Sequence, residues 1–239
     1  MRLLVTRPKE DADTLAGTLR ASGHSAVVAP IMEVRPREGP MLPLRGIQAV
    51  LATSANGVRA LAGRTERRDI TLYAVGPQTA EAAERAGFEV IYNAQGDAAA
   101  LADFVAAHAD PTKGALLHAA GEETAGRLSQ SLQTRGFTVE SQVLYGAYPV
   151  ETLPEAASNA LRDGVLDGVL LFSPRSAKSF TALVTDAGYA PVCAKLTAFC
   201  ISAATAAALT PLTFERMAVA GAPNQDAMLA LLPPPVPGP

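Results

Sequence analysis

The sequence predicts an α/β protein built from two similar lobes, each a parallel sheet flanked by helices. Short, continuous apolar runs alternate with alanine-rich amphipathic stretches, which is typical of buried parallel strands covered by helices on both faces. The same order of features occurs twice, which indicates an internal duplication. At 239 residues the chain is long enough for two small domains, since one domain takes roughly 100–200 residues.

The chain opens on a strand, a helix and a second strand. Leu3-Leu4-Val5 is the first apolar run. Leu15 and Leu19 then lie four positions apart on one helical face, and Gly23 supplies the conformationally free residue that ends a helix. Further strands are expected at residues 26–29, 49–51, 72–75, 90–91, 115–117, 169–172, 198–201 and 217–219, and further helices at residues 78–85, 98–107 and 124–134.

The internal repeat consists of three pairs of segments that keep their order. Residues 15–23 correspond to residues 128–136 through a Leu, Leu, Gly pattern. Residues 51–57 and 171–176 each contain a strand that ends in Ser, and residues 74–80 (AVGPQTA) correspond to residues 200–206 (CISAATA). Each pair alone is weak in an alanine-rich chain, so the order of the three pairs is what supports duplication.

Composition restricts the classes of function. With 49% hydrophobic and 18% charged residues, the chain has the make-up of a globular protein. The formal net charge of -3 gives no broad positive field, so we expect no nucleic-acid partner, and any anionic ligand must be held by local groups. No apolar run reaches the roughly 18 residues of a membrane helix, and the first residues turn polar too early for a signal peptide. We therefore expect no membrane association and a cytoplasmic location.

Metal binding is not expected. Cys193 and Cys200 lack a CxxC spacing and are interpreted as reduced, buried thiols. His24, His108 and His118 share no helical face, so each is expected at the surface or hydrogen-bonded in the core.

Proline marks the candidate linkers and the last residues of the sequence. Residues 35–40 and 148–154 contain prolines, which favour extended chain over helix. Residues 233–239 (PPPVPGP) are expected to form an extended, flexible tail rather than a polyproline-recognition segment.

Candidate ligand-binding residues follow the strands, because ligands of open parallel sheets bind beyond the carboxyl ends of the strands. Four such turns carry hydroxyl groups beside the first N–H groups of a helix, which suits carboxylates or phosphates. They are residues 53–57, 76–79, 173–176 and 202–205. Helix capping by Ser or Thr explains any one of them equally well. No GxGxxG, Walker or GxSxG motif is present, so neither nucleotide binding nor nucleophilic hydrolysis is supported.

Six short motifs occur in a fixed order along nearly the whole chain. They are residues 4–8 (LVTRP), 53–58 (TSANGV), 74–80 (AVGPQTA), 143–145 (VLY), 172–176 (FSPRS) and 201–206 (ISAATA). This ordered set resembles the uroporphyrinogen-III synthase family. The resemblance implies two flavodoxin-like or Rossmann-like lobes joined by a two-stranded linker. It places residues 1–35 and 150–239 in one lobe and residues 38–147 in the other.

The resemblance also implies a cofactor-free synthase of tetrapyrrole biosynthesis. In the family's reaction, linear hydroxymethylbilane loses water from its hydroxymethyl end and closes to uroporphyrinogen III with the terminal pyrrole ring inverted. The enzyme has to fold this flexible polycarboxylate so that its ends meet, and bringing the two ends together supplies most of the rate enhancement of such ring closures. We therefore expect a monomer whose central cleft is lined by hydroxyls and amides and contains no metal.

The same resemblance assigns roles to residues. Tyr145 is the candidate acid that protonates the departing hydroxyl, although a linker tyrosine packed by its ring is an equally good interpretation. The hydroxyls of residues 54, 79, 173 and 205 are expected to face one cleft from opposite lobes. The expected substrate-binding residues are Arg7, Thr53, Ser54, Thr79, Ser173, Arg175, Ser176 and Thr205, with Lys178 as a further source of charge.

Two non-enzymatic interpretations stay open. The first is a two-lobed small-molecule binding protein, since architecture does not fix chemistry. The second is a degenerate synthase homologue that retained only binding. A receiver-like regulatory domain is disfavoured, because Thr6-Arg7 follows the first strand where paired acids are needed.

Overall fold

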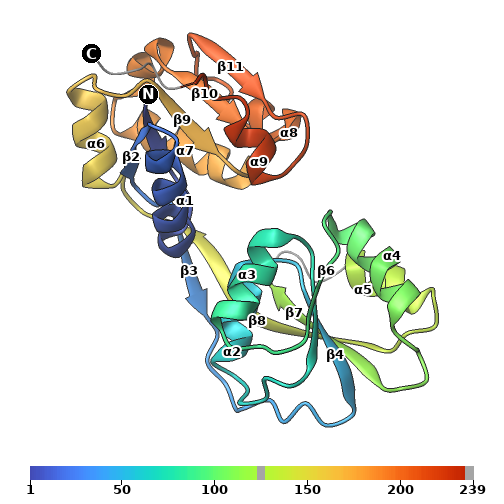
Figure 1. Ribbon diagram of the computed structural model, residues 1–239. Helices are drawn as coiled ribbons and strands as arrows, with labels where there is room; N and C mark the ends of the chain where they lie inside the picture. The colour runs from blue at the N-terminus through green and yellow to red at the C-terminus, as the bar shows by residue number, and fades with distance from the viewer. Residues whose placement is uncertain (123–126, 235–239) are drawn as a thin grey trace. The chain divides into compact units, whose positions relative to one another are not determined.

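A computed structural model describes residues 1–122 and 127–234 of the chain (Figure 1). The chain divides into two compact units. Unit 1 comprises Met1–Glu33 and Tyr148–Pro239, and unit 2 comprises Val34–Ala147. The chain therefore passes from unit 1 to unit 2 and back again. Of the expected proline-rich tail, residues 235–239 lie outside the described residues.

Unit 1 contains a five-stranded sheet in the order β11-β10-β9-β1-β2, with every neighbouring pair parallel. Its strands are β1 (Arg2–Val5), β2 (Ser25–Val28), β9 (Gly168–Leu171), β10 (Thr197–Cys200) and β11 (Arg216–Val219). Every residue of β9 is buried, as expected for a central parallel strand with both faces covered. The continuous apolar runs of the sequence are explained by this burial.

The helices of unit 1 cover both faces of this sheet (Figure 1). They are α1 (Lys9–Ala21), α6 (Glu155–Arg162), α7 (Pro174–Asp186), the 3-10 helix η1 (Ala190–Lys195), α8 (Ala203–Ala207) and α9 (Gln225–Leu229). On α1, Leu15 and Leu19 are fully buried and Gly23 follows with a φ of +74°, as the sequence predicts. These leucines pack with Leu3 and Phe199 in the core, which fixes the start of α1 beside the end of β1.

Unit 2 contains a six-stranded sheet in the order β3-β8-β7-β4-β5-β6. Its strands are β3 (Met32–Pro36), β4 (Ile47–Ala52), β5 (Thr71–Ala74), β6 (Ile91–Asn93), β7 (Ala115–Gly121) and β8 (Val139–Pro149). The pairs from β8 to β6 are parallel. The carboxyl ends of β4, β5 and β7 therefore lie at one edge of the sheet.

Two apolar cores lie on opposite faces of this sheet. Val50 and Ala52 of β4 belong to the core under α2 (Ala55–Ala62) and α3 (Pro77–Arg85). Ala49 and Leu51 belong to the core under α4 (Ala98–His108) and α5 (Arg127–Gln133). Side chains alternate between the faces of a strand, so β4 supplies both cores. The α/β fold with helices on both faces of parallel sheets is confirmed.

Strands β3 and β8 connect the two units. The Arg37 N–H donates to the Leu144 carbonyl over 2.7 Å and the Val150 N–H to the Ile31 carbonyl over 3.1 Å, so the two segments run antiparallel. Loops that link the lobes were expected at residues 35–40 and 148–154, and the resemblance implied a two-stranded linker; β3 extends to Pro36 and β8 to Pro149, at the start of these segments. Proline lacks an N–H donor and is tolerated where a strand ends.

Two further comparisons concern the helices. A helix was expected over residues 124–134; the structure has α5 at Arg127–Gln133, and residues 124–126 of the expected range lie outside the described residues. None of the described helices is long and apolar enough to cross a membrane.

Candidate functional site

In unit 2, the expected site residues gather where β4 and its neighbours end. Thr53 and Ser54 follow β4, and Thr79 lies in the first turn of α3, just after β5. β8 is longer and carries Tyr145 opposite Gly121, the last residue of β7. Parallel strands end at the same edge, so the sequence places these four side chains at one edge of the sheet.

Ser54 is the residue that starts α2. Its backbone is extended, with φ -159° and ψ 154°, and its Oγ accepts the Gly57 N–H over 3.1 Å. This cap satisfies one of the N–H groups that a helix leaves unpaired at its start. A Cβ on Gly57 would lie 2.6 Å from the Ala119 carbonyl oxygen, so only glycine allows α2 to approach β7 this closely. The Ser54 hydroxyl is thereby fixed above the sheet.

Tyr145 brings its hydroxyl to this same turn. The Tyr145 Oη lies 2.7 Å from the Ser54 Oγ, and either atom is able to donate the hydrogen. The ring rests on Gly121, where an added Cβ would come 2.7 Å from Cζ and 2.8 Å from Oη. Tyr145 is 7% exposed. The packing of the ring and the hydrogen bond together hold the phenol in one position.

Hydrogen bonding gives this pair two arrangements. Ser54 Oγ accepts from Gly57 in both of them. If Ser54 donates, the hydrogen between the two oxygens belongs to the serine and the phenol hydrogen points elsewhere; if Tyr145 donates, that hydrogen belongs to the phenol. In both arrangements the Tyr145 and Ser54 oxygens stay joined by a hydrogen bond.

His118 lies beside this pair on β7 and was not expected to belong to a site. It is completely buried, and its Nε2 lies 3.4 Å from the Thr53 Oγ1. Its Nδ1 has no hydrogen-bond partner among the described residues, which corrects the expectation of a surface or fully hydrogen-bonded histidine. Burial lowers the pKa of His118 to about 4, so the ring is neutral at neutral pH. The sequence does contain one indication that His118 is buried, since it stands inside the apolar run LLHAA at residues 116–120.

Thr79 lies on the next helix of unit 2. The residue that starts α3 is Gly76, which has no side chain, and Pro77 follows at the first helical position. Thr79 is 4% exposed, and its N–H donates to the Gly76 carbonyl over 3.1 Å. Thr79 is therefore not the cap of its helix, so the simple capping explanation offered for this turn does not apply to its side chain.

Two turns in unit 1 repeat the geometry of Ser54. Ser173 starts α7 and accepts the Ser176 N–H over 3.0 Å, and Ser202 starts α8 and accepts the Thr205 N–H over 3.2 Å. Their backbones are extended, with φ -163° and -157°. Each cap also bonds to the hydroxyl three residues on, at 2.9 Å for Ser176 and 3.0 Å for Thr205. Helix capping is thus one observed role of both turns.

The two hydroxyl residues of each turn differ in how far they are buried. Thr205 is completely buried and Ser176 is 8% exposed, whereas Ser173 and Ser202 are half-buried. The strand ends in unit 1 therefore present the capping serines, with the second hydroxyl of each pair behind them. Ser202 lies in one of the four turns that were expected to bind a ligand, although only Thr205 of that turn was named as a substrate-binding residue.

Arg7 follows β1 in unit 1 and is held by three elements. Its Nη2 lies 3.0 Å from the Asp11 carboxylate on α1, and its Nη1 donates to Gln225 of α9 over 3.2 Å. The guanidinium lies 4.5 Å from the centre of the Phe172 ring, just after β9. Asp11 thus offsets part of the charge that Arg7 was expected to offer a substrate carboxylate. Arg175 and Lys178 lie farther along, on α7, and Lys178 is exposed.

The structure unites some of the expected residues and leaves others apart. It joins Ser54 to Tyr145, with the neighbouring Thr53 bonded to His118, and it joins Ser173 to Ser176. That the hydroxyls of both units face one cleft stays a prediction. Among residues 1–122 and 127–234, no three His, Cys, Asp or Glu side chains are arranged to hold a metal ion. Burial raises the pKa values of Cys193 and Cys200 to about 11, so these thiols stay protonated.

Comparison with known proteins extends these observations. A uroporphyrinogen-III synthetase from Helicobacter pylori is 18% identical, with 97% of this chain and 98% of that chain covered and a TM-score of 0.63. A mutant uroporphyrinogen III synthase from the thermophilic bacterium Thermus thermophilus is 16% identical over 96% of both chains, with a TM-score of 0.47. A further structure of the Thermus thermophilus synthase is also 16% identical, over 96% of this chain and 97% of that chain, with a TM-score of 0.40.

The Helicobacter pylori structure shows that the α/β fold is shared. No protein among those with curated descriptions matches the chain significantly. The family profile described as uroporphyrinogen-III synthase HemD matches residues 13–230, which is most of the sequence. The chain therefore belongs to the uroporphyrinogen-III synthase family.

Proposed function

We propose that this chain converts linear hydroxymethylbilane to uroporphyrinogen III, with loss of water and inversion of the terminal pyrrole ring. The observation that carries the proposal is the Tyr145–Ser54 hydroxyl pair, 2.7 Å apart at the strand ends of a family member. The proposal also covers a lyase that needs no metal or cofactor and a cytoplasmic, monomeric protein. Chelation with EDTA and light scattering test the metal and the oligomeric state.

The first step requires an acid. The carbon–oxygen bond of the hydroxymethyl group breaks, the oxygen takes up a proton and leaves as water, and the pyrrole nitrogen stabilises the resulting azafulvene cation. The Tyr145 hydroxyl is the proposed donor of that proton. Ser54 supports this role when it donates its own hydrogen to the Tyr145 oxygen, because the phenol proton is then directed away from Ser54.

The later steps require geometry rather than further acid. The terminal ring attacks the cation through its substituted carbon and forms a spiro intermediate, which fragments and closes again with that ring reversed. A proton is lost at the end, and no oxidant or reductant is consumed. Holding the two ends of the chain together contributes roughly 7–11 kcal/mol in well-oriented ring closures. The hydroxyls and helix N-termini at the strand ends are suited to hold the carboxylate arms while this occurs.

The competing interpretation of Tyr145 is purely structural. Its ring packs on Gly121 and is nearly buried, which is also what a packing tyrosine needs. Only the acid role requires the phenol proton, whereas the packing role requires only the ring. Replacing Tyr145 by Phe therefore distinguishes the two interpretations.

The experiment is incubation of the purified full chain with hydroxymethylbilane, followed by oxidation and chromatographic separation of the porphyrin isomers. The expected product is the type III isomer in excess of the spontaneous type I isomer. A product ratio equal to that of a heat-denatured sample would overturn the proposal and leave a homologue that only binds tetrapyrroles. Calorimetric titration with uroporphyrin then measures whether such binding remains.

A further inference from the structure

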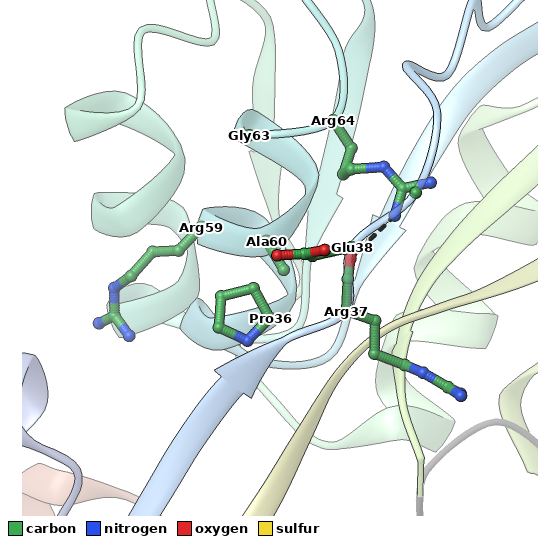
Figure 2. Close-up of a pocket in the computed structure, with 8 residues that line it drawn as sticks. Pro36, Arg37, Glu38, Arg59, Ala60, Gly63 and Arg64 are labelled. Carbon is green, nitrogen blue, oxygen red and sulfur yellow. Dashed lines mark hydrogen bonds between the residues drawn. The ribbon is translucent and has the colours of Figure 1, made fainter.

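Unit 2 contains a pocket of about 500 Å³ that the proposed chemistry does not use. One wall is the segment just after β3, and the other is the carboxyl-terminal part of α2 with the two residues that follow it (Figure 2). The lining residues are Pro36, Arg37, Glu38, Gly39, Arg59, Ala60, Gly63 and Arg64. Three arginines and one glutamate thus line the pocket, on a chain whose formal net charge is -3.

Arg64 is the most informative of these residues. It is 9% exposed, and its Nε and Nη1 donate to the carbonyls of Pro40 and Arg37 over 2.9 and 3.0 Å. Figure 2 shows the guanidinium turned toward the segment that follows β3. Among the described residues, no carboxylate lies within ion-pair distance of Arg64. A guanidinium has five N–H donors, so these two bonds leave most of its hydrogen-bonding capacity unused.

A nearly buried cation without an anionic partner is unfavourable, because bonds to carbonyls and limited contact with solvent compensate only in part for its desolvation. An anion in the adjoining pocket supplies that partner. Carboxylates suit this position in particular, since a guanidinium binds their two oxygens with parallel hydrogen bonds.

Gly39 determines where the Arg64 guanidinium lies. A Cβ at this position would be 2.6 Å from Nη2 and 2.9 Å from Cζ of Arg64. The clash is with the end of a flexible side chain, and the backbone of Gly39 does not require glycine. Alanine at position 39 therefore displaces the guanidinium without straining the main chain.

The helix end beside the pocket is partly neutralised. The carboxyl end of a helix carries partial negative charge on its unpaired carbonyls. Here Arg68 donates from Nη2 to the Ala62 carbonyl over 3.0 Å and so occupies one of these carbonyls. The partial charge that disfavours anions at the end of α2 is thereby reduced.

Arg59 connects the pocket to the proposed active site. Its Nη1 donates to the Asn56 side chain over 2.5 Å, and Asn56 is the second residue after the Ser54 cap. Residues 56 and 60 lie on one face of α2 because they are four positions apart, and Gly63 follows the end of the helix. At 1.5 Å per residue, the distance along the helix from Ser54 to Arg64 is roughly 15 Å. A ligand of several linked rings with carboxylate arms is long enough to cover this distance.

We propose that this pocket is a carboxylate-binding site centred on Arg64, and that it takes a carboxylate arm of the linear tetrapyrrole. The second part rests on the proposed function. A small free carboxylate is the other source of the same chemistry. Glu38 lines the same pocket and opposes an anion by charge repulsion, so removing its charge strengthens binding.

The experiment compares four variants of the full chain in two assays. Arg64→Gln and Gly39→Ala weaken the site, Glu38→Gln strengthens it, and Arg85→Gln is the matched control, because Arg85 is an exposed cation on α3 outside the pocket. Calorimetric titration with citrate measures the site alone, and steady-state kinetics with hydroxymethylbilane measures its use by the substrate. Thermal melting confirms that each variant is folded.

The variants that weaken the site are expected to raise the citrate Kd, and the variant that strengthens it is expected to lower the citrate Kd. Loss of a charge-assisted hydrogen bond lowers affinity by about tenfold or more, so Arg64→Gln and Gly39→Ala raise the citrate Kd by about that factor. Glu38→Gln lowers the citrate Kd, and Arg85→Gln leaves it unchanged. If the substrate uses the site, KM changes in the same direction as the citrate Kd, and changes more than kcat does.

Three outcomes overturn the proposal in whole or in part. Citrate binding that is absent, or insensitive to all four variants, removes the site itself. If the citrate affinities change as expected while KM stays constant, the carboxylate site exists but the substrate does not use it. Its ligand is then a small free carboxylate. If the wild-type chain does not form the type III isomer, the proposed function fails while the citrate titration still decides whether the site exists. If Arg64→Gln does not fold, Gly39→Ala and Glu38→Gln decide the question.

Discussion

Replacing Tyr145 by Phe removes a single hydroxyl from the proposed site. The ring keeps its contact with Gly121, and Ser54 keeps its hydrogen bond from the Gly57 N–H. What is lost is the 2.7 Å bond between Tyr145 Oη and Ser54 Oγ. A typical hydrogen bond contributes about 0.5–1.5 kcal/mol to the free energy of unfolding. A protein with a stability of about 5–15 kcal/mol therefore stays folded.

The effect on turnover is expected to be much larger than the effect on stability. A positioned general acid contributes about 100- to 10,000-fold to the rate. We therefore expect Tyr145→Phe to lower kcat for type III formation by about 100-fold or more while the melting temperature changes by only a few degrees. The assay measures both isomers, so that spontaneous closure to type I is subtracted at each time point.

Two further variants make this test specific. Tyr73→Phe removes the hydroxyl of an equally buried tyrosine in unit 2 that packs against Tyr92 and Phe104, so it serves as the control and leaves turnover unchanged. Ser54→Ala combined with Tyr145→Phe tests whether the two hydroxyls act together. Residues in direct contact show coupling energies of about 0.5–3 kcal/mol, so the double variant should lose less than the sum of the single losses. Turnover of Tyr145→Phe equal to wild type would refute the acid role.

The remaining predictions concern stability and metal dependence. The pKa of His118 is lowered from 6.5 to about 4 in the folded protein, so the unfolded chain binds more protons between these values. The free energy of unfolding, measured by urea titration, should fall by about 2 kcal/mol from pH 7 to pH 5. His118→Leu should make this fall smaller. An equal fall in the variant contradicts the assignment of the pH dependence to His118. Gly57→Ala places a methyl group against the Ala119 carbonyl and should cost about 1–3 kcal/mol of stability, measured by the same titrations, whereas Gly17→Ala, where nothing lies within 4 Å, should not. Type III formation should persist when EDTA is present in excess over the protein; loss of activity that zinc restores contradicts the absence of a catalytic metal.

The strands of both sheets were predictable because burial on both faces leaves a continuous apolar run. Residues 169–172 illustrate this, since every residue of β9 is buried. β3 and the outer part of β8 were not predictable in the same way. Their residues are largely exposed or half-buried, so they give no apolar run, and their prolines indicate extended loops that link the lobes. They are strands because they pair with each other.

The candidate site was predictable where its geometry is local. A serine that follows a strand and precedes a helix caps that helix, and Ser54, Ser173 and Ser202 adopt nearly the same backbone conformation for this reason. Features that depend on distant residues were missed. His118 meets Thr53, 65 positions away, and Arg64 is held by carbonyls 24 and 27 positions away. No local pattern reports such pairings.

The fraction of type III isomer formed at increasing concentrations of the purified chain, with EDTA present and no cofactor added, tests the central claim most directly. The claim is that this chain alone directs ring closure with inversion. The predicted result is a type III fraction that rises with protein concentration and approaches completeness as the enzymatic reaction outruns spontaneous closure. A fraction that stays at the spontaneous level at every protein concentration would contradict the account.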